Sequence, residues 1–207
     1  QSEVFTSVHY GTNDIWATTK TKIINDAGTD QSQTLTSSDD PSWTTHHPKG
    51  YDIVANGSQV LKYDGSNWGS LGGVSQSAKY LSTYNNFVFI AGHSGGKVEW
   101  CAIGDPDTWN GSNWVMPGTA RGLIPHRESN YFFTDLGWHQ LRGFNELTMS
   151  VPYSGQPGTT SHRSLVSTPF GLFYWAEEGI MWKPDNTLST ENISRYRIPK
   201  TLSALNF

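Results

Sequence analysis

The sequence has a single cysteine, few charged residues and no long apolar run. Cys101 has no second cysteine to pair with, so no intrachain disulfide supports the fold, and we expect a small buried side chain in a strand over residues 98–103. Charged residues make up 15% of the chain, against about 25% in a typical globular protein. The composition argues against a helical bundle or coiled coil. No apolar stretch approaches the length of a transmembrane helix, so we expect no membrane anchor.

Aromatic rings and turn-forming residues are abundant. Phe, Trp and Tyr together account for 13% of the residues, with nine of each, alongside 21 glycines and 10 prolines. A disordered chain would lack so many rings, and this composition predicts an all-β fold with many tight turns. No linker divides the chain, so we expect residues 1–207 to form a single domain. Because the chain starts at Gln1 rather than Met, we also expect a processed start or a piece of a longer polypeptide.

A short hydrophobic run recurs five times, and a second apolar strand follows each run after a turn. The runs are 15–17, 53–55, 87–91, 131–134 and 172–176, and the strands that follow are 22–24, 59–63, 98–101, 138–141 and 180–183. The small residues that end successive runs are 36 to 43 positions apart. About 40 residues for four short strands is the period of a propeller blade. The sequence therefore predicts an all-β, β-propeller-like fold of about five irregular four-stranded blades, with a β-sandwich with long loops as the alternative.

Finer expectations concern the tryptophans, the chain ends and helices. Four tryptophans follow Asx turns and should lie at matching blade positions and pack between blades: Trp43, Trp68, Trp109 and Trp114. We expect a strand over residues 3–8 to complete the last blade and so close the ring. Helix is expected only over residues 187–195 and 201–207.

Several acids lie near the starts of predicted strands, where a glycosidase on a five-bladed propeller would need them. Asp14 and Asp52 directly precede apolar runs, and Glu99 and Asp135 lie nearby in their blades. The equivalent positions in other blades hold Asn86, Asn130 and Gly171. Since the pattern does not repeat, these acids are better explained as side chains that cap turns. We therefore expect no catalytic residue and no enzyme activity.

The histidines do not form a recognisable metal motif. They lie at positions 9, 46, 47, 93, 126, 139 and 162. Their spacing does not fit a zinc site, and the chain has no calcium loop, phosphate-binding loop, nucleophile elbow or dinucleotide fingerprint. We expect no metal, no cofactor and no cofactor-binding residue.

Positive charge is concentrated in the second part of the chain. The net charge is -4, with -5 over residues 1–120 and +1 over residues 121–207. All six arginines lie in the second part: Arg121, Arg127, Arg142, Arg163, Arg195 and Arg197. Scattered arginines on β-proteins usually form salt bridges at the rim. The alternative is that they line a path for a polyanion such as DNA.

Residues 80–195 contain an ordered set of motifs. Residues 84–92 read YNNFVFIAG, and residues 100–109 read WCAIGDPDTW. The segments that continue the series are 122–127, 131–134, 138–143, 161–166, 171–175, 178–182 and 193–194. In this order the motifs resemble propeller-like virion proteins of tailed bacteriophages, such as tail hub, nozzle or head-to-tail connection components. The resemblance covers about the last 120 residues, and residues 1–79 match only by the blade period.

This resemblance implies a structural protein of the virion that assembles in a ring around the DNA path. It implies a homo-oligomer that contacts other tail or connector proteins, at the phage tail or head–tail junction, with weak contact to passing DNA. The sequence leaves two rivals: a carbohydrate-binding propeller, as a lectin or a receptor-binding domain that uses exposed tryptophans, and a glycosidase.

Overall fold

The computed structural model describes residues 4–36, 40–75, 77–185 and 187–195. They form five four-stranded antiparallel sheets, and each sheet comes from one continuous stretch of chain. We call the sheets blades 1 to 5. Blade 1 holds β1 (Ser7–Tyr10), β2 (Ile15–Thr18), β3 (Lys22–Ile24) and β4 (Asp30–Thr34). Blade 2 holds β5 (Ser42–His46), β6 (Tyr51–Ala55), β7 (Val60–Tyr63) and β8 (Trp68–Ser70).

The other three blades repeat this order. Blade 3 holds β9 (Tyr80–Tyr84), β10 (Phe87–Ala91), β11 (Lys97–Trp100) and β12 (Asn113–Val115). Blade 4 holds β13 (Ala120–His126), β14 (Ser129–Thr134), β15 (Trp138–Arg142) and β16 (Ser150–Gly155). Blade 5 holds β17 (Val166–Thr168), β18 (Gly171–Ala176), β19 (Gly179–Pro184) and β20 (Glu191–Asn192). The predicted all-β fold with five four-stranded blades is confirmed.

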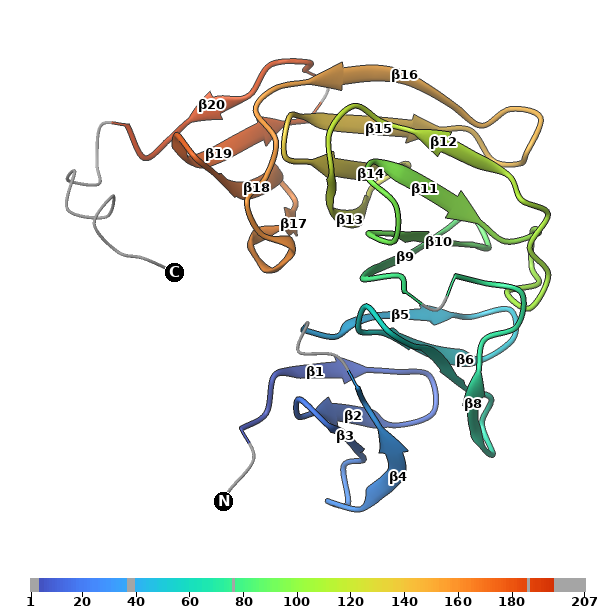
Figure 1. Cartoon of the computed structure of the whole chain (residues 1–207). Coiled ribbons are helices and arrows are strands. Elements are labelled where there is room, and N and C mark those ends of the chain that lie inside the picture. The colour runs from blue at the N-terminus through green and yellow to red at the C-terminus, as the bar shows by residue number, and fades with distance from the viewer. Residues whose placement is uncertain (1–3, 37–39, 76, 186, 196–207) are drawn as a thin grey trace.

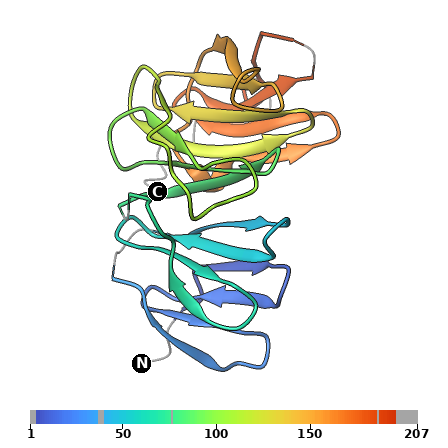
Figure 2. The same cartoon turned by 90° about the vertical axis from the view of Figure 1, so that its right-hand side faces the viewer.

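The blades follow one another around an arc (Figure 1). The first strand of each blade lies on the inner side of the arc, and an opening separates blade 5 from blade 1. Figure 2, seen from the convex side, shows the blades in sequence order from blue to orange. No described residue belongs to a helix long and apolar enough to cross a membrane.

The predicted hydrophobic runs are the second strands of the blades, and the strands predicted after them are the third strands. The run at 15–17 is β2 and the strand at 22–24 is β3, for example. Two expectations were wrong. The N-terminal strand does not complete the last blade, because β1 pairs with β2 and blade 5 builds all four of its strands from residues 166–192. Residues 187–195 are not helical and contain β20, while residues 201–207 lie outside the described residues.

The hydrophobic core lies in the seams between neighbouring blades. Blades 1 and 2 share a cluster around Trp16 and Val54, and blades 4 and 5 share one around Phe133 and Tyr174. The blades in the middle of the arc are covered on both faces. All five residues of β10 are buried, although side chains in a strand alternate between two faces.

The tryptophan prediction is confirmed in part. Trp68 and Trp114 both lie in fourth strands and pack across seams: Trp68 meets the Trp16 ring of blade 1 edge-on at 5.0 Å, and Trp114 lies 6.2 Å from the Phe132 ring of blade 4. Trp43 and Trp109 also pack between blades, Trp43 on the His9 ring of blade 1 and Trp109 against the cluster that blades 2 and 3 share, but they do not lie at the matching position. Trp43 lies in β5, whereas Trp109 lies in the loop between β11 and β12, where its indole donates a hydrogen bond to the Pro106 carbonyl.

A 3-10 turn, η1 (His162–Ser164), leads into blade 5 and links the inner ends of four blades. The Arg163 guanidinium donates to the Thr6 carbonyl of blade 1 at 2.7 Å and pairs with Asp40 at 2.8 Å. His162 contacts the Ser42 hydroxyl at 3.3 Å and the Tyr80 ring. Contacts of this turn therefore connect blade 5 to blades 1, 2 and 3 on the inner side of the arc.

Candidate functional site

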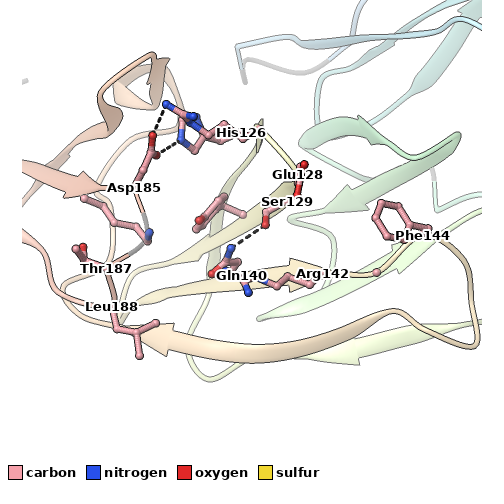
Figure 3. A pocket seen from close by; sticks show the side chains of 13 residues that line it. His126, Glu128, Ser129, Gln140, Arg142, Phe144, Asp185, Thr187 and Leu188 are labelled. Atoms are coloured by element: carbon pink, nitrogen blue, oxygen red, sulfur yellow. Dashed lines mark hydrogen bonds and ion pairs between the residues drawn. The ribbon is translucent and has the colours of Figure 1, made fainter.

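A pocket of about 800 Å³ lies where blade 4 meets blade 5 (Figure 3). Its walls come from the turn between β13 and β14, the end of β15 and the segment that follows β19. The lining residues are His126, Arg127, Glu128, Ser129, Tyr131, Gln140, Arg142, Gly143, Phe144, Lys183, Asp185, Thr187 and Leu188. This volume falls within the range of ligand sites, about 300–1,000 Å³.

One wall of the pocket is a polar clamp that joins the two blades. The buried His126 imidazole contacts the Asp185 carboxylate at 2.6 Å through Nε2 and the Ser167 hydroxyl at 2.8 Å through Nδ1. Asp185 also forms an ion pair with Arg127, whose guanidinium donates to the Pro169 carbonyl. Hydroxyl, imidazole and carboxylate follow one another as in a catalytic triad. Here the Asp185 carboxylate is already paired with Arg127. We therefore assign Ser167, His126 and Asp185 a structural role, in which they stabilise the seam between blades 4 and 5.

Lys183 lies at the base of the pocket and is only 3% exposed. It occupies a position in β19 where the alternation places side chains against blade 4, as for Met181. Its ammonium lies 5.1 Å from the Tyr131 ring centre and 5.0 Å from that of Trp138. Burial lowers the pKa of Lys183 and raises the pKa of Tyr131 to about 12. The two ring faces stabilise a cation that has lost most of its water.

Arg142 supplies a second positive charge on the same floor. It ends β15, is exposed, and lies next to Gln140 in Figure 3. The positive charge of Arg142 lowers the pKa of Lys183 further, which reflects the closeness of the two cations. Gln140 donates to the Ser129 hydroxyl at 2.7 Å, so these two neutral groups are paired with each other.

The rim of the pocket is apolar. Phe144 is 68% exposed and Leu188 is 55% exposed, and Figure 3 shows them on opposite sides of the opening. Cationic groups at the base and apolar groups at the mouth suit an anionic ligand with an apolar part.

The acids that the sequence singled out do not meet in this pocket. Asp52 is fully buried in the seam between blades 1 and 2, where it accepts hydrogen bonds from Thr12 N, Asn13 N and the Trp16 indole. Asp14 caps the start of β2 by accepting from the Ile15 N–H. The cap at Asp14 is the one that the sequence predicted, whereas Asp52 lies within β6 and binds a turn of the neighbouring blade instead of capping its own strand.

The other two acids lie in blades 3 and 4. Glu99 pairs with Lys97 and lies 3.5 Å from the His93 imidazole. Asp135 accepts from the Thr119 N–H. The expectation of no enzyme activity stays a prediction.

The arginines divide among separate places. Arg127 and Arg142 line the pocket, and Arg163 links blade 5 to blade 1. Arg121 lies 4.0 Å from Asp135 at the start of β13 and lines a second, smaller pocket with Gln156. Arg195 is the last described residue, and Arg197 lies outside the described residues. A continuous path for DNA along all six arginines stays a prediction.

The histidines are dispersed in the same way, and Cys101 is buried as expected. Within the described ranges, no cluster of three or more His, Cys, Asp or Glu side chains is placed to hold a metal ion. Burial raises the pKa of the Cys101 thiol to about 11. Burial also lowers the pKa of several histidines, and His162 reaches about 4.

Sequence reasoning missed this pocket because its walls come from segments some 40 residues apart. One signal was present. Within the strand at 180–183, Lys183 follows Met181 at the spacing that puts both side chains on one face, and a lone lysine on a core face indicates a buried cation.

No family model matches the sequence, and no curated protein matches it either. Among solved structures, the chain is similar to Kluyveromyces lactis Hsv2, a β-propeller, with a TM-score of 0.54 and 11% sequence identity. The match covers 87% of this chain and 59% of the Hsv2 chain. The chain thus spans about three fifths of the length of this neighbour, and the likeness establishes the propeller fold alone.

Proposed function

We propose that the chain is a structural subunit of a tailed-phage virion that assembles in a ring around the DNA path. The observation that carries the proposal is that both ends of the arc present apolar sheet faces. The order of motifs in residues 80–195 supports the virion setting.

The face of blade 5 that points away from blade 4 is rich in aromatic side chains. In β18 and β19, the residues that alternate with the buried ones are Phe173, Trp175, Ile180 and Trp182. Phe173 lies opposite Trp182, and their rings stack 6.3 Å apart. All four side chains are half-buried, whereas their neighbours on the other face pack against blade 4.

The free face of blade 1 is also apolar. Val8 is 60% exposed and Tyr10 is 78% exposed. Tyr10 lies opposite the exposed Ile15, while Trp16 and Ile23 on the other face are buried against blade 2. Exposed apolar groups gathered on one sheet face mark a surface that binds another protein element.

The occupant that fits both faces is a further four-stranded blade. The middle blades, such as blade 3, have two apolar faces because each packs between two neighbours. Blades 1 and 5 have the same two-faced pattern with one neighbour each among the described residues. The Hsv2 chain extends beyond the matched region, as a ring with additional blades would require.

The test begins with purified virions from the native source, using mass spectrometry and negative-stain imaging. We expect the chain in stoichiometric copies at the tail or the head–tail junction. A chain that is absent from virions and exists only as a soluble monomer would refute the proposal.

A matched pair of variants tests the docking faces. Trp182→Lys places a charge on the free face of blade 5, and Val115→Lys places one on the outer strand of blade 3, where Val115 is 73% exposed. We expect the first variant to be lost from assembled particles and the second to be incorporated as the unmodified chain is. Equal incorporation of both variants would contradict the role of the blade 5 face.

A carbohydrate-binding propeller is the second candidate, and the aromatic face of blade 5 favours it, since stacked rings are also platforms for sugars. Titration with a glycan panel separates the two. Sugar binding would quench tryptophan fluorescence in the unmodified chain and less in Trp182→Lys, whereas a blade-docking face gives no response.

A further inference from the structure

The lining of the blade 4–5 pocket holds more basic than acidic side chains: Arg127, Arg142 and Lys183 against Glu128 and Asp185. Asp185 is held by His126 and Arg127, and its charge partly offsets the lowering of the Lys183 pKa by burial. The Lys183 ammonium makes one hydrogen bond within the described part of the chain, to the Pro184 carbonyl at 3.4 Å. An ammonium has three donors, so Lys183 has donor capacity that a ligand acceptor would satisfy.

The second cation makes the site suited to a carboxylate. Arg142 lines the same pocket as Lys183, on the strand of blade 4 that also carries Gln140. An anion placed between a guanidinium and an ammonium accepts charge-assisted hydrogen bonds from both, which are stronger than neutral ones. It also relieves the repulsion between the two cations.

The rim adds a requirement for apolar contact. Phe144 and Leu188 face the mouth of the pocket from its two sides, and Leu147, in the same loop as Phe144, is 97% exposed. A bare inorganic anion would leave these side chains in water. A polypeptide segment with an acidic residue next to an apolar one meets both the charge of the base and the apolar rim.

We propose that the blade 4–5 pocket binds an acidic side chain of a partner polypeptide, with Lys183 and Arg142 on the carboxylate and Phe144 and Leu188 on its apolar neighbour. The source of the partner, a neighbouring subunit, rests on the proposed function. The chemistry of the pocket does not, since it follows from the residues that line it.

The test is calorimetric titration of the isolated chain with short peptides at fixed ionic strength. The probe is the acetylated and amidated pentapeptide Leu-Glu-Leu-Glu-Leu, and its counterpart has Gln in place of Glu. We expect the Glu peptide to bind about tenfold more tightly or better. Glucuronate and inorganic phosphate are titrated in parallel as a sugar acid and a bare anion.

Three variants assign the binding to the pocket. We expect Lys183→Met and Arg142→Gln each to weaken binding of the Glu peptide by about tenfold. Lys20→Met, a change at an exposed lysine in blade 1, should leave it unchanged. Because Lys183 is buried, circular dichroism is used to check that Lys183→Met folds. If Lys183→Met does not fold, the binding measured for Arg142→Gln, a change at an exposed residue, tests the proposal.

Three results would overturn the proposal: equal binding of the Glu and Gln peptides, binding that survives both pocket variants, or saturation by glucuronate or phosphate with no peptide binding. These measurements use the isolated chain. Their failure is therefore distinct from failure of the virion proposal, which depends on finding the chain in particles.

Discussion

Replacing Asp52 with asparagine should destabilise the seam between blades 1 and 2. The Asp52 Oδ2 atom accepts from the Trp16 indole at 2.9 Å and from the Asn13 N–H at 3.2 Å. An asparagine side chain at this position keeps one oxygen for the Thr12 N–H but turns an NH₂ group toward the other donors. Trp16 is 1% exposed, so its N–H has no access to water as a substitute.

The expected cost follows from these contacts. A buried donor left unpaired costs about 1–3 kcal/mol, and a hydrogen bond to a charged acceptor contributes about 1.5–3 kcal/mol. The exposed Asn13 recovers bonds to water, so its share is small. We expect the free energy of unfolding to fall by about 3 kcal/mol, which lowers the Tm by about 6–12 °C in a chain of this size.

A double-mutant cycle with Trp16→Phe isolates the contact. Urea unfolding is followed by circular dichroism for the two single variants and the double variant, with Asp26→Asn at an exposed turn as the control. Because a phenylalanine ring in place of the Trp16 indole has no N–H to leave unpaired, Asp52→Asn should cost about 1–2 kcal/mol less in that background. Additive effects, or an Asp52→Asn variant as stable as the Asp26→Asn control, would refute this account of the seam.

Three further predictions concern a turn, a histidine and the cysteine. Gly96→Ala should lower the Tm strongly, because a Cβ there would lie 2.0 Å from the Met116 carbonyl oxygen. In the control Gly95→Ala, the new Cβ meets open space and should cost only about 1 kcal/mol for the positive φ of Gly95. Equal losses of Tm in the two variants would contradict the clash at Gly96. Burial and Arg163 hold the pKa of His162 at about 4, so the unfolded chain takes up the proton first. The contribution of His162 to stability should be constant above about pH 6.5 and fall toward pH 4 by at most about 1.4 kcal/mol per pH unit. His162→Gln should make the pH profile shallower by this share in melts from about pH 7.5 to 4, while the other buried histidines keep theirs. The Cys101 thiol, buried with its pKa raised to about 11, should react with Ellman's reagent only as the protein unfolds in urea, and immediate labelling in buffer would show an open seam.

The strands that sequence reasoning predicted are the apolar second and third strands of each blade. Every residue of β10 and β14 is buried because a neighbouring blade covers each face, and β10 is apolar throughout. The innermost strands after β1 were missed because polar residues interrupt their apolar pattern. In β5 the sequence is SWTTH, and its side chains bond across the inner surface, as Thr44 does with Thr83 of blade 3 at 2.8 Å. Such strands give no hydrophobic signal.

The wrong expectations have local causes. Residues 187–195 have no apolar face to bury, and the Asn192 side chain instead accepts from the N–H groups of Ser194 and Arg195, which fixes a turn. The N-terminal strand has apolar residues, as the last strand of a ring would, but those residues lie on the free face of blade 1. The residues of the strand show that it has an apolar face, but they do not show which other element covers that face.

The link between Arg163 and Thr6 bears on the order in which the molecule forms. Each blade is one continuous stretch, so its strand pairs join residues close in sequence and can form soon after that stretch leaves the ribosome. The Arg163 contact joins positions 157 residues apart. Blades 1 to 3 can therefore fold before Arg163 is available to contact Thr6. Synthesis of η1 supplies it, so the mutual position of the first and last blades is fixed late in folding.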